Sequence, residues 1–333
     1  MQMRAKMTLV GAAVGALWAF GTPQAHALET VKVTQAVASF SFLPADYAKA
    51  AGYFKKEGLN VQQIATRGGG PDMAALVSGN VTFNFGVGVY EINALIQNQP
   101  LVNVLNMEDR PSISVVLSRA AVAKTGLKPS ASLARRAAAL KGLKIGITRP
   151  GSLTDKEIRH LAKIGGLKKG DIKIVAIGRP QSMIAALKLG QIDGFSISIP
   201  YDRLAVDKML AVEWINNPAG QDNSVDPFMM SSLVTTPQMV KQHPDLIRKM
   251  VKALRHAMQD IITKPVPAIR SVIAHEYSKI DTHTLDVSIA AAKKLMNPTG
   301  KVTLQMAQNT VAFDGRGASA QALFKTFDSQ FLK

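Results

Sequence analysis

The 333-residue chain has no cysteine, only two tryptophans, and far fewer acidic than basic residues, 23 against 40. Without cysteine there is no disulfide framework and no thiolate to bind a metal. A metal site would need histidines and carboxylates, but the histidines show neither H-x-H nor H-x-x-x-H spacing. We therefore expect no metal site and no cofactor. The histidines beyond the N-terminal region are interpreted as scattered surface or core residues: His160, His243, His256, His275 and His283.

Long apolar runs are also scarce, and the one that stands out extends from Met7 to Phe20. Arg4 and Lys6 precede this run and Ala25-His26-Ala27 follows it, which is the pattern of a secretory signal peptide with an A-x-A cleavage site. The run is shorter than the ~20 residues of a membrane-spanning helix, which argues against a permanent anchor. We predict that residues 1–27 are a signal peptide cleaved after Ala27. Because no cysteine can carry a lipid, we expect the mature protein to diffuse freely in the periplasm.

The formal charge of +17 loses only Arg4 and Lys6 with the signal peptide. A positive balance of this size suggests nucleic acid as a partner, but an exported protein does not meet the genome. Many basic residues occur as pairs on otherwise amphipathic segments: Lys55-Lys56, Arg135-Arg136, Lys168-Lys169 and Lys293-Lys294. We expect solvated faces, no nucleic-acid partner, and a diffuse positive field that attracts anions.

One sequence pattern occurs twice. Residues 67–83 read RGGGPDMAALVSGNVTF, and residues 179–195 read RPQSMIAALKLGQIDGF. Leu76 and Leu187 are 111 residues apart, and so are Gly79 and Gly190. A period of this length is the size of a domain and not of a solenoid repeat. The duplication therefore predicts two similar lobes, and a cleft between two lobes is a common place for a small ligand to bind.

Strand and helix patterns alternate through both copies, which predicts βαβ units and mostly parallel sheets. The expected strands are 31–38, 61–67 and 81–87 in the first copy, and 143–149, 172–178 and 193–199 in the second. The segment 112–119 is expected to be an extended crossing strand, 227–236 a return strand, and the chain from Pro237 mostly helical. We predict lobe I from 28–115 plus 222–333 and lobe II from 116–221, joined by two crossing segments that form a hinge.

Four segments in order along the chain carry a resemblance to one protein family: GYFKKEGLNV at 52–61, RGGGPDMAALVSGNVTFNFG at 67–86, KIGITRPGSLTD at 144–155 and AALKLGQIDGF at 185–195. Together they resemble the substrate-binding proteins of ABC importers in the nitrate, sulfonate and taurine group, the NMT1/THI5-like family. The resemblance implies an α/β, two-lobed periplasmic-binding-protein fold of type II, in which each lobe is a mostly parallel sheet flanked by helices. It also implies a protein that closes on one small solute and delivers it to a membrane permease. We expect a monomer.

Ligands of open α/β sheets bind beyond the carboxyl ends of the strands, where helix N-termini present free N–H groups. The predicted binding residues of lobe I are Ser39, Phe40, Ser41, Arg67, Gly68, Gly69, Gly86, Val87 and Gly88. Those of lobe II are Arg149, Gly151, Ser152, Ser196, Ser198 and Tyr201. Arg67 and Arg149 on opposed loops favour an anionic solute such as a carboxylate or a sulfonate.

Purely structural roles remain open for several of these residues. Ser152 is as well placed to cap a helix as to contact a ligand, although the resemblance implies that a Gly-Ser pair at this position meets the ligand. Phe40 and Tyr201 either wall off an apolar part of the solute or belong to the core, and Tyr90 is expected in the core. The glycines after Arg67 either let a ligand approach the backbone closely or form a flexible turn.

The patterns of common hydrolases are absent, since the sequence contains no G-x-S-x-G and no H-E-x-x-H. The predicted cleft loops also hold no histidine for acid–base chemistry, so we predict no catalytic residues. The resemblance includes a pyrimidine-synthesising enzyme branch, but that branch needs a cysteine-rich motif. The main prediction is a binding protein that closes about a hinge. The alternative is a ligand sensor that presents its closed form to a membrane receptor.

Overall fold

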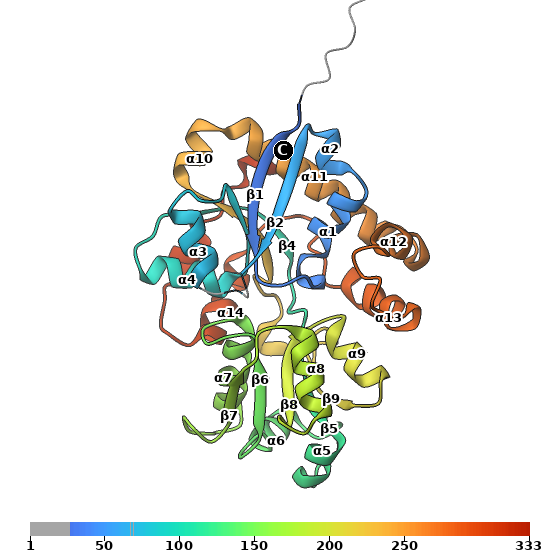
Figure 1. Ribbon diagram of the computed structural model, residues 1–333. Helices are drawn as coiled ribbons and strands as arrows, with labels where there is room; N and C mark the ends of the chain where they lie inside the picture. Colours follow the sequence, from blue (N-terminus) through green and yellow to red (C-terminus); the bar gives the residue numbers. More distant parts are fainter. Residues whose placement is uncertain (1–26, 67, 69) are drawn as a thin grey trace, which may run out of the picture.

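The frame of the molecule is a pair of mixed β-sheets, one in the upper and one in the lower half of Figure 1. The computed structural model describes residues 27–66, 68 and 70–333. Within these residues the strand orders are β2-β1-β3-β10-β4 and β7-β6-β8-β5-β9. In both sheets three parallel strands are followed by an antiparallel strand and then by one more strand at the edge. The predicted α/β fold with two lobes is therefore confirmed.

The sheet of lobe I combines both ends of the chain. Its parallel strands are β1 (Glu29–Gln35), β2 (Leu59–Ala65) and β3 (Phe83–Gly86), and β10 (Ser231–Thr235) lies between β3 and β4 (Val102–Glu108). The helical elements among these strands are η1 (Phe40–Phe42), α1 (Leu43–Ala50), α2 (Tyr53–Lys56), α3 (Gly70–Val77) and α4 (Gly88–Ile96). β10 is buried along its whole length, which is typical of a strand covered on both faces.

The chain after β10 is helical, as the sequence predicts. The elements are α10 (Pro237–Gln242), α11 (Pro244–Thr263), α12 (Val266–Ile273), α13 (Thr282–Lys293), α14 (Leu304–Asp314), α15 (Ala320–Phe324) and η3 (Ser329–Leu332). The apolar side chains of α11 recur at helical spacing on the side that packs against α1 and α2. Leu246, Ile247, Met250, Val251 and Leu254 are all buried in the core, while Met239 and Val240 on α10 are only partly buried.

The sheet of lobe II is built from the middle of the chain. Its parallel strands are β6 (Lys144–Ile147), β7 (Lys173–Ala176) and β8 (Gly194–Ser198), and β5 (Ile113–Ser118) lies between β8 and β9 (Ala211–Asn216). The helices of this lobe are α5 (Arg119–Thr125), α6 (Leu133–Ala138), α7 (Leu153–Ile164), α8 (Pro180–Lys188) and α9 (Tyr201–Asp207). The fully buried Trp214 anchors α6 to this sheet, because its indole N–H donates to the Arg136 carbonyl oxygen at 3.0 Å.

The duplicated sequence pattern folds into equivalent elements of the two lobes. The first copy contains α3 and leads into β3, and the second copy contains α8 and leads into β8. β3 and β8 occupy the same third position in their sheets. The spacing of the repeat therefore corresponds to one whole lobe.

Two segments carry the chain between the lobes. β4 and β5 belong to different sheets, as do β9 and β10, so the first crossing is 109–112 and the second is 217–230. The crossings lie side by side, because Phe228 N–H donates to the Asp109 carbonyl oxygen at 2.7 Å. The boundary expected between residues 115 and 116 falls within β5, since an apolar extended run has the same pattern in a crossing as in a sheet. We propose 28–108 plus 231–333 as lobe I and 113–216 as lobe II.

Several carboxyl groups are buried inside the lobes. Glu91 on α4 is fully buried, and Asn103 Nδ2 donates to its two carboxylate oxygens at 3.1 and 3.2 Å. Burial raises the pKa of Glu91 to about 7, although the hydrogen bonds from Asn103 oppose this shift. Burial also raises the pKa of Glu157 to about 7 and the pKa values of Asp46 and Asp202 to about 6. The folded protein thus holds these protons more tightly than the unfolded chain does.

We expect the free energy of unfolding to fall as the pH rises from about 5 to about 8. The pKa of Glu91 is about 7 in the fold against an ordinary value of 4.5. Its stabilising contribution is therefore complete below the ordinary value and is lost at ~1.4 kcal/mol per pH unit up to the raised one. Glu91→Gln removes this titration and should flatten the profile by about 3 kcal/mol. Urea unfolding of the wild type, Glu91→Gln and the exposed control Glu29→Gln tests this, and three identical profiles would contradict it.

Candidate functional site

The carboxyl ends of strands from the two sheets meet at a seam between the lobes (Figure 1). The chain after β1 reaches Ser41, whose Oγ donates to Ser198 Oγ at the end of β8, at 2.8 Å. Phe40 N–H donates to the Ile199 carbonyl oxygen at 2.9 Å along the same seam. The two lobes are thus in contact through residues that follow their central strands, which is where ligands of open α/β sheets bind.

A cavity of about 30 Å³ lies at this seam and is lined by both lobes. Its polar groups are hydroxyls, and no charged side chain among the described residues lines it. The hydroxyls come from Ser39, Ser41, Tyr90, Thr148, Thr154 and Ser198. A buried water needs at least ~10–15 Å³ of such space, so the cavity is large enough for a water molecule or a similarly small polar group.

Most of the hydroxyls around the cavity are hydrogen-bonded to one another. Thr148 Oγ1 lies 3.0 Å from Thr154 Oγ1, and Ser41 Oγ lies 3.0 Å from Ser112 Oγ on the first crossing. Ser39 is the exception: its side chain is fully buried, and its Oγ has no hydrogen-bond partner among the described residues. Buried polar groups in proteins are nearly always satisfied, so an unpartnered hydroxyl in a cavity wall points to a polar ligand or to water.

Helix α7 directs its N-terminus at lobe I. Ser152 caps the helix by accepting a hydrogen bond from Asp155 N–H at 3.4 Å, so the capping role is present. Gly151 has a φ of +77°, a left-handed conformation that favours glycine, and its N–H donates to Asp155 Oδ2 at 2.8 Å. The Leu153 N–H donates to the Tyr90 hydroxyl of lobe I at 3.3 Å. The positive end of the helix dipole therefore faces the seam.

The structure brings four of the predicted binding residues into the cavity wall: Ser39, Ser41, Val87 and Ser198. Gly68 lies against Tyr90, and Gly151 lines a second pocket at the margin of the seam. Arg67 and Gly69 lie outside the described residues, as do residues 1–26, in which the signal peptide is predicted.

The other predicted residues lie close by but do not line the cavity. Phe40 is fully buried and packs edge-on against Tyr277, with ring centroids 4.9 Å apart. Gly88 is required by packing, because a Cβ there would lie 2.7 Å from the Met229 Cβ. The remaining members of this group are Gly86, Ser196 and Tyr201, all of them buried.

Arg149, the second arginine predicted to favour an anion, faces an acidic residue of the opposite lobe. Burial raises the pKa of Asp72 on α3 to about 6, while the Thr66 hydroxyl and the Arg149 guanidinium act in the opposite direction. Arg149 is half-buried and lines neither the cavity nor the marginal pocket. Part of its charge is therefore balanced within the protein when the lobes are together.

Sequence reasoning missed several residues that line the cavity. Thr148 directly precedes the predicted binding residues from Arg149 to Ser152 and Thr154 follows them by two positions, so nearby hydroxyls were an available signal. Tyr90 is buried as expected, yet it lines both the cavity and the marginal pocket. Ile113 directly follows the first crossing and Met230 is the last residue of the second, and no local pattern marks them as lining residues.

Neither a metal centre nor a membrane span is found in the part of the chain that the structure describes. In residues 27–66, 68 and 70–333, no three histidine or carboxylate side chains come together as a set of metal ligands. Over the same residues, no helix combines the length and the apolar character needed to cross a bilayer.

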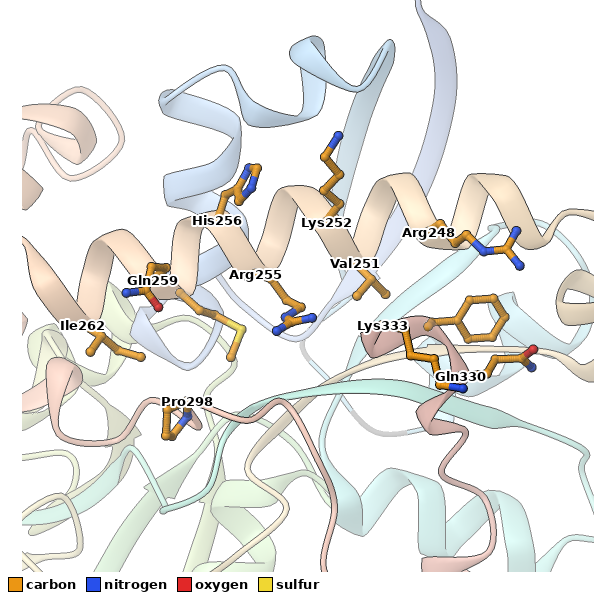
Figure 2. Close-up of a pocket in the computed structure, with 12 residues that line it drawn as sticks. Arg248, Val251, Lys252, Arg255, His256, Gln259, Ile262, Pro298, Gln330 and Lys333 are labelled. Atoms are coloured by element: carbon orange, nitrogen blue, oxygen red, sulfur yellow. The ribbon is translucent and has the colours of Figure 1, made fainter.

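A larger concavity of about 690 Å³ lies between α11 and the C-terminal segment (Figure 2). Arg248, Lys252 and Arg255 project around it from α11. Asp245 lies 2.6 Å from Arg248 Nη1, and Glu57 lies 2.9 Å from Lys252 Nζ, so two of these charges are balanced. All the lining residues of this groove belong to lobe I. We therefore place the functional site at the seam, to which both lobes contribute.

Two α/β lobes, joined by paired crossings and closed over a cavity, define the class of two-lobed periplasmic-binding-protein folds. A protein of Bordetella bronchiseptica RB50 aligns with a TM-score of 0.80 at 20% identity, over 91% of this chain and 95% of that one. The alkanesulfonate-binding protein SsuA of Xanthomonas axonopodis pv. citri, solved with MOPS, aligns with a TM-score of 0.68 at 13% identity. That alignment covers 90% of this chain and 98% of SsuA. At these identities the alignments establish the fold.

Residues 33–275 match the sequence model of the NMT1-like family, and the chain belongs to this family. The nitrate/nitrite binding protein NrtA of Nostoc sp. is 25% identical over 254 residues, which cover 68% of this chain and 54% of NrtA. The 4-amino-5-hydroxymethyl-2-methylpyrimidine phosphate synthase THI13 of Saccharomyces cerevisiae is 23% identical over 242 residues, which cover 69% of this chain and 66% of the enzyme. The chain thus spans between about half and two thirds of these curated relatives.

We expect Gly68→Ala to displace Tyr90 from the seam. A Cβ at Gly68 would lie 2.4 Å from the Tyr90 hydroxyl, and the φ of +81° adds backbone strain. Gly52→Ala is the matched control, because Gly52 has a φ of +74° but nothing within 4 Å of a Cβ. Both variants should lose about 1–3 kcal/mol of stability from strain, and Gly68→Ala should lose more. Hydrogen exchange at the Leu153 amide reports the Tyr90 contact, and equal protection in both variants would refute this role of Gly68.

Proposed function

We propose that this protein is the solute-binding component of an ABC import system, exported to the periplasm and without catalytic activity. The main support is the cavity at the seam. Its hydroxyls come from both lobes and include Ser39 Oγ, which has no hydrogen-bond partner among the described residues. Membership of the NMT1-like family and the similarity to a nitrate/nitrite binding protein support it. The partner that receives the solute is then a membrane permease.

Capture of the solute uses the crossings at 109–112 and 217–230 as a hinge. With the lobes apart, Ser41 and Ser198 are open to water and a solute binds to one lobe first. Closure adds the contacts of the other lobe, so the solute stabilises the closed form by its greater affinity for it. The closed cavity of about 30 Å³ admits only a small group, so a larger solute must hold the lobes further apart.

We propose a small organic anion, such as a sulfonate or a carboxylate, as the solute. The net charge, +17 for the full sequence and +15 without Arg4 and Lys6, attracts anions, and the N-terminus of α7 presents the positive end of its dipole at the seam. No acidic side chain among the described residues lines the cavity. The relatives named for nitrate/nitrite and alkanesulfonate binding support the same class.

An enzymatic function is the competing hypothesis, because a pyrimidine phosphate synthase is among the relatives. This chain has no cysteine, and no histidine lines the cavity within the described residues. A hydroxyl-lined cavity without a group that titrates near neutral pH suits binding better than acid–base catalysis. A sensor would use the same site, and a permease and an ATPase encoded beside this gene would favour the transport role.

The solute is identified by mass spectrometry of the small molecule that copurifies with the mature protein, followed by calorimetry with that compound. We expect Ser39→Ala and Ser41→Ala each to raise its Kd about tenfold, because losing one hydrogen bond costs about 1–1.5 kcal/mol. Ser182→Ala on the exposed side of α8 is the matched control. Unchanged affinity in both cavity variants would show that the solute binds elsewhere.

Hinge closure has its own test in small-angle X-ray scattering of the protein with and without that compound. We expect the radius of gyration to decrease when the solute is added, because contacts from both lobes are complete only in the closed form. Superimposable curves at saturating solute would contradict the hinge mechanism.

A further inference from the structure

A second pocket, of about 280 Å³, lies at the margin of the seam. Gly70, Asn93 and Arg316 line it from lobe I, and Gly151, Asp155 and Lys156 line it from lobe II. Tyr90 lines both this pocket and the cavity, so the two spaces adjoin at this residue. We refer to this space as the mouth pocket. It is several times larger than the closed cavity.

The mouth pocket has cationic groups from opposite lobes. Lys156 Nζ on α7 lies 3.0 Å from Asp314 Oδ1 at the end of α14. Arg316 donates two hydrogen bonds to the same carboxylate, from Nε to Oδ2 at 2.7 Å and from Nη2 to Oδ1 at 3.0 Å. Arg316 Nη1 also donates to Asn93 Oδ1 at 2.9 Å. Among the described residues, two cations therefore share one buried carboxylate, and one positive charge is left over.

Asp155, the acidic residue among the described lining of the mouth pocket, does not neutralise this remaining positive charge. Asp155 Oδ1 lies 3.0 Å from Arg159 Nε on the same helix, and its Oδ2 accepts from Gly151 N–H. Asp155 and Arg159 thus balance each other. The cavity behind Tyr90 has only neutral polar groups among its described lining residues. In the described lining of both spaces, the unbalanced positive charge therefore lies at the mouth pocket.

We propose that the mouth pocket binds the anionic group of the solute, with Lys156 and Arg316 as its counter-charges, while the uncharged part of the solute faces the hydroxyl-lined cavity. This proposal rests on the proposed binding function and assigns a place to the charge of the solute. Lys156 is only 12% exposed, so its attraction for an anion is screened less than that of a surface lysine.

The position of the two cations also links recognition to closure. Among the described residues, the ion pair of Lys156 with Asp314 is the one that joins the two lobes. An anion between Lys156 and Arg316 is attracted by both lobes only when they are together. The anionic group would therefore favour the closed form, whereas a neutral analogue would lack this contribution.

The test measures binding of three anionic probes, butane-1-sulfonate, butyrate and butyl phosphate, and of the neutral analogue butyramide, by calorimetry on the full mature chain. Lys156→Gln and Arg316→Gln each remove one cation of the mouth pocket. Lys163→Gln is the matched control, because Lys163 is an exposed lysine in the last turn of the same helix. Thermal unfolding of each variant verifies that it is folded before binding is compared.

We expect at least one anionic probe to bind, with a Kd raised tenfold or more in Lys156→Gln and Arg316→Gln and changed less than twofold in Lys163→Gln. Butyramide should bind more weakly than the anions and respond equally little to all three substitutions. The proposal is overturned if no anionic probe binds, or if the anions bind equally well to the wild type and the mouth variants. It is also overturned if butyramide binds and loses as much affinity as the anions, because Lys156 then acts only on closure.

These outcomes are separable from failure of the proposed function. If Ser39→Ala and Ser41→Ala weaken binding of the copurifying compound while Lys156→Gln and Arg316→Gln do not, the binding function stands and the mouth subsite is wrong. If no compound induces closure or binds at the seam, the proposed function itself fails.

Discussion

The contact between the two lobes is centred on the hydrogen bond from Ser41 to Ser198, where the chain leaving β1 of lobe I meets the end of β8 of lobe II. Ser112 on the first crossing joins them, 3.0 Å from Ser41 Oγ. Buried hydroxyls need partners, and these three satisfy one another only while the lobes are together. When the lobes part, water or a solute must replace the lost contacts, so the same groups serve closure and recognition.

Charge is kept out of the centre of the seam and placed at its margin. Transferring an ion from water into a protein interior costs several kcal/mol unless it is well paired, so a small buried cavity is better lined by hydroxyls. Lys156 and Arg316 each pair with Asp314 beside the cavity and not within it. The carboxyl group of Glu91, buried inside lobe I, meets the same constraint in another way, because burial raises its pKa to about 7.

Much of the fold and part of the site could be predicted because they depend on local pattern. Loops that follow parallel strands lie at one edge of a sheet, and this rule places Ser39, Ser41, Val87 and Ser198 in the cavity wall. The rule does not predict that Thr154, in the first turn of α7, lines the cavity. It also does not predict this for Met230, the last residue of the second crossing. Their positions depend on how the lobes pack.

The duplication, the alternation of strands and helices, and the family are predictable from the amino-acid sequence, because they depend on spacing and residue type along the chain. The packing of the two lobes places β5 in lobe II, brings Tyr90 into the lining of two pockets, and sets Lys156 against Asp314 across the seam. Hydrophobic periodicity indicates which face of a helix or strand is buried. It does not indicate which element packs against that face, because that depends on contacts between segments far apart in the chain.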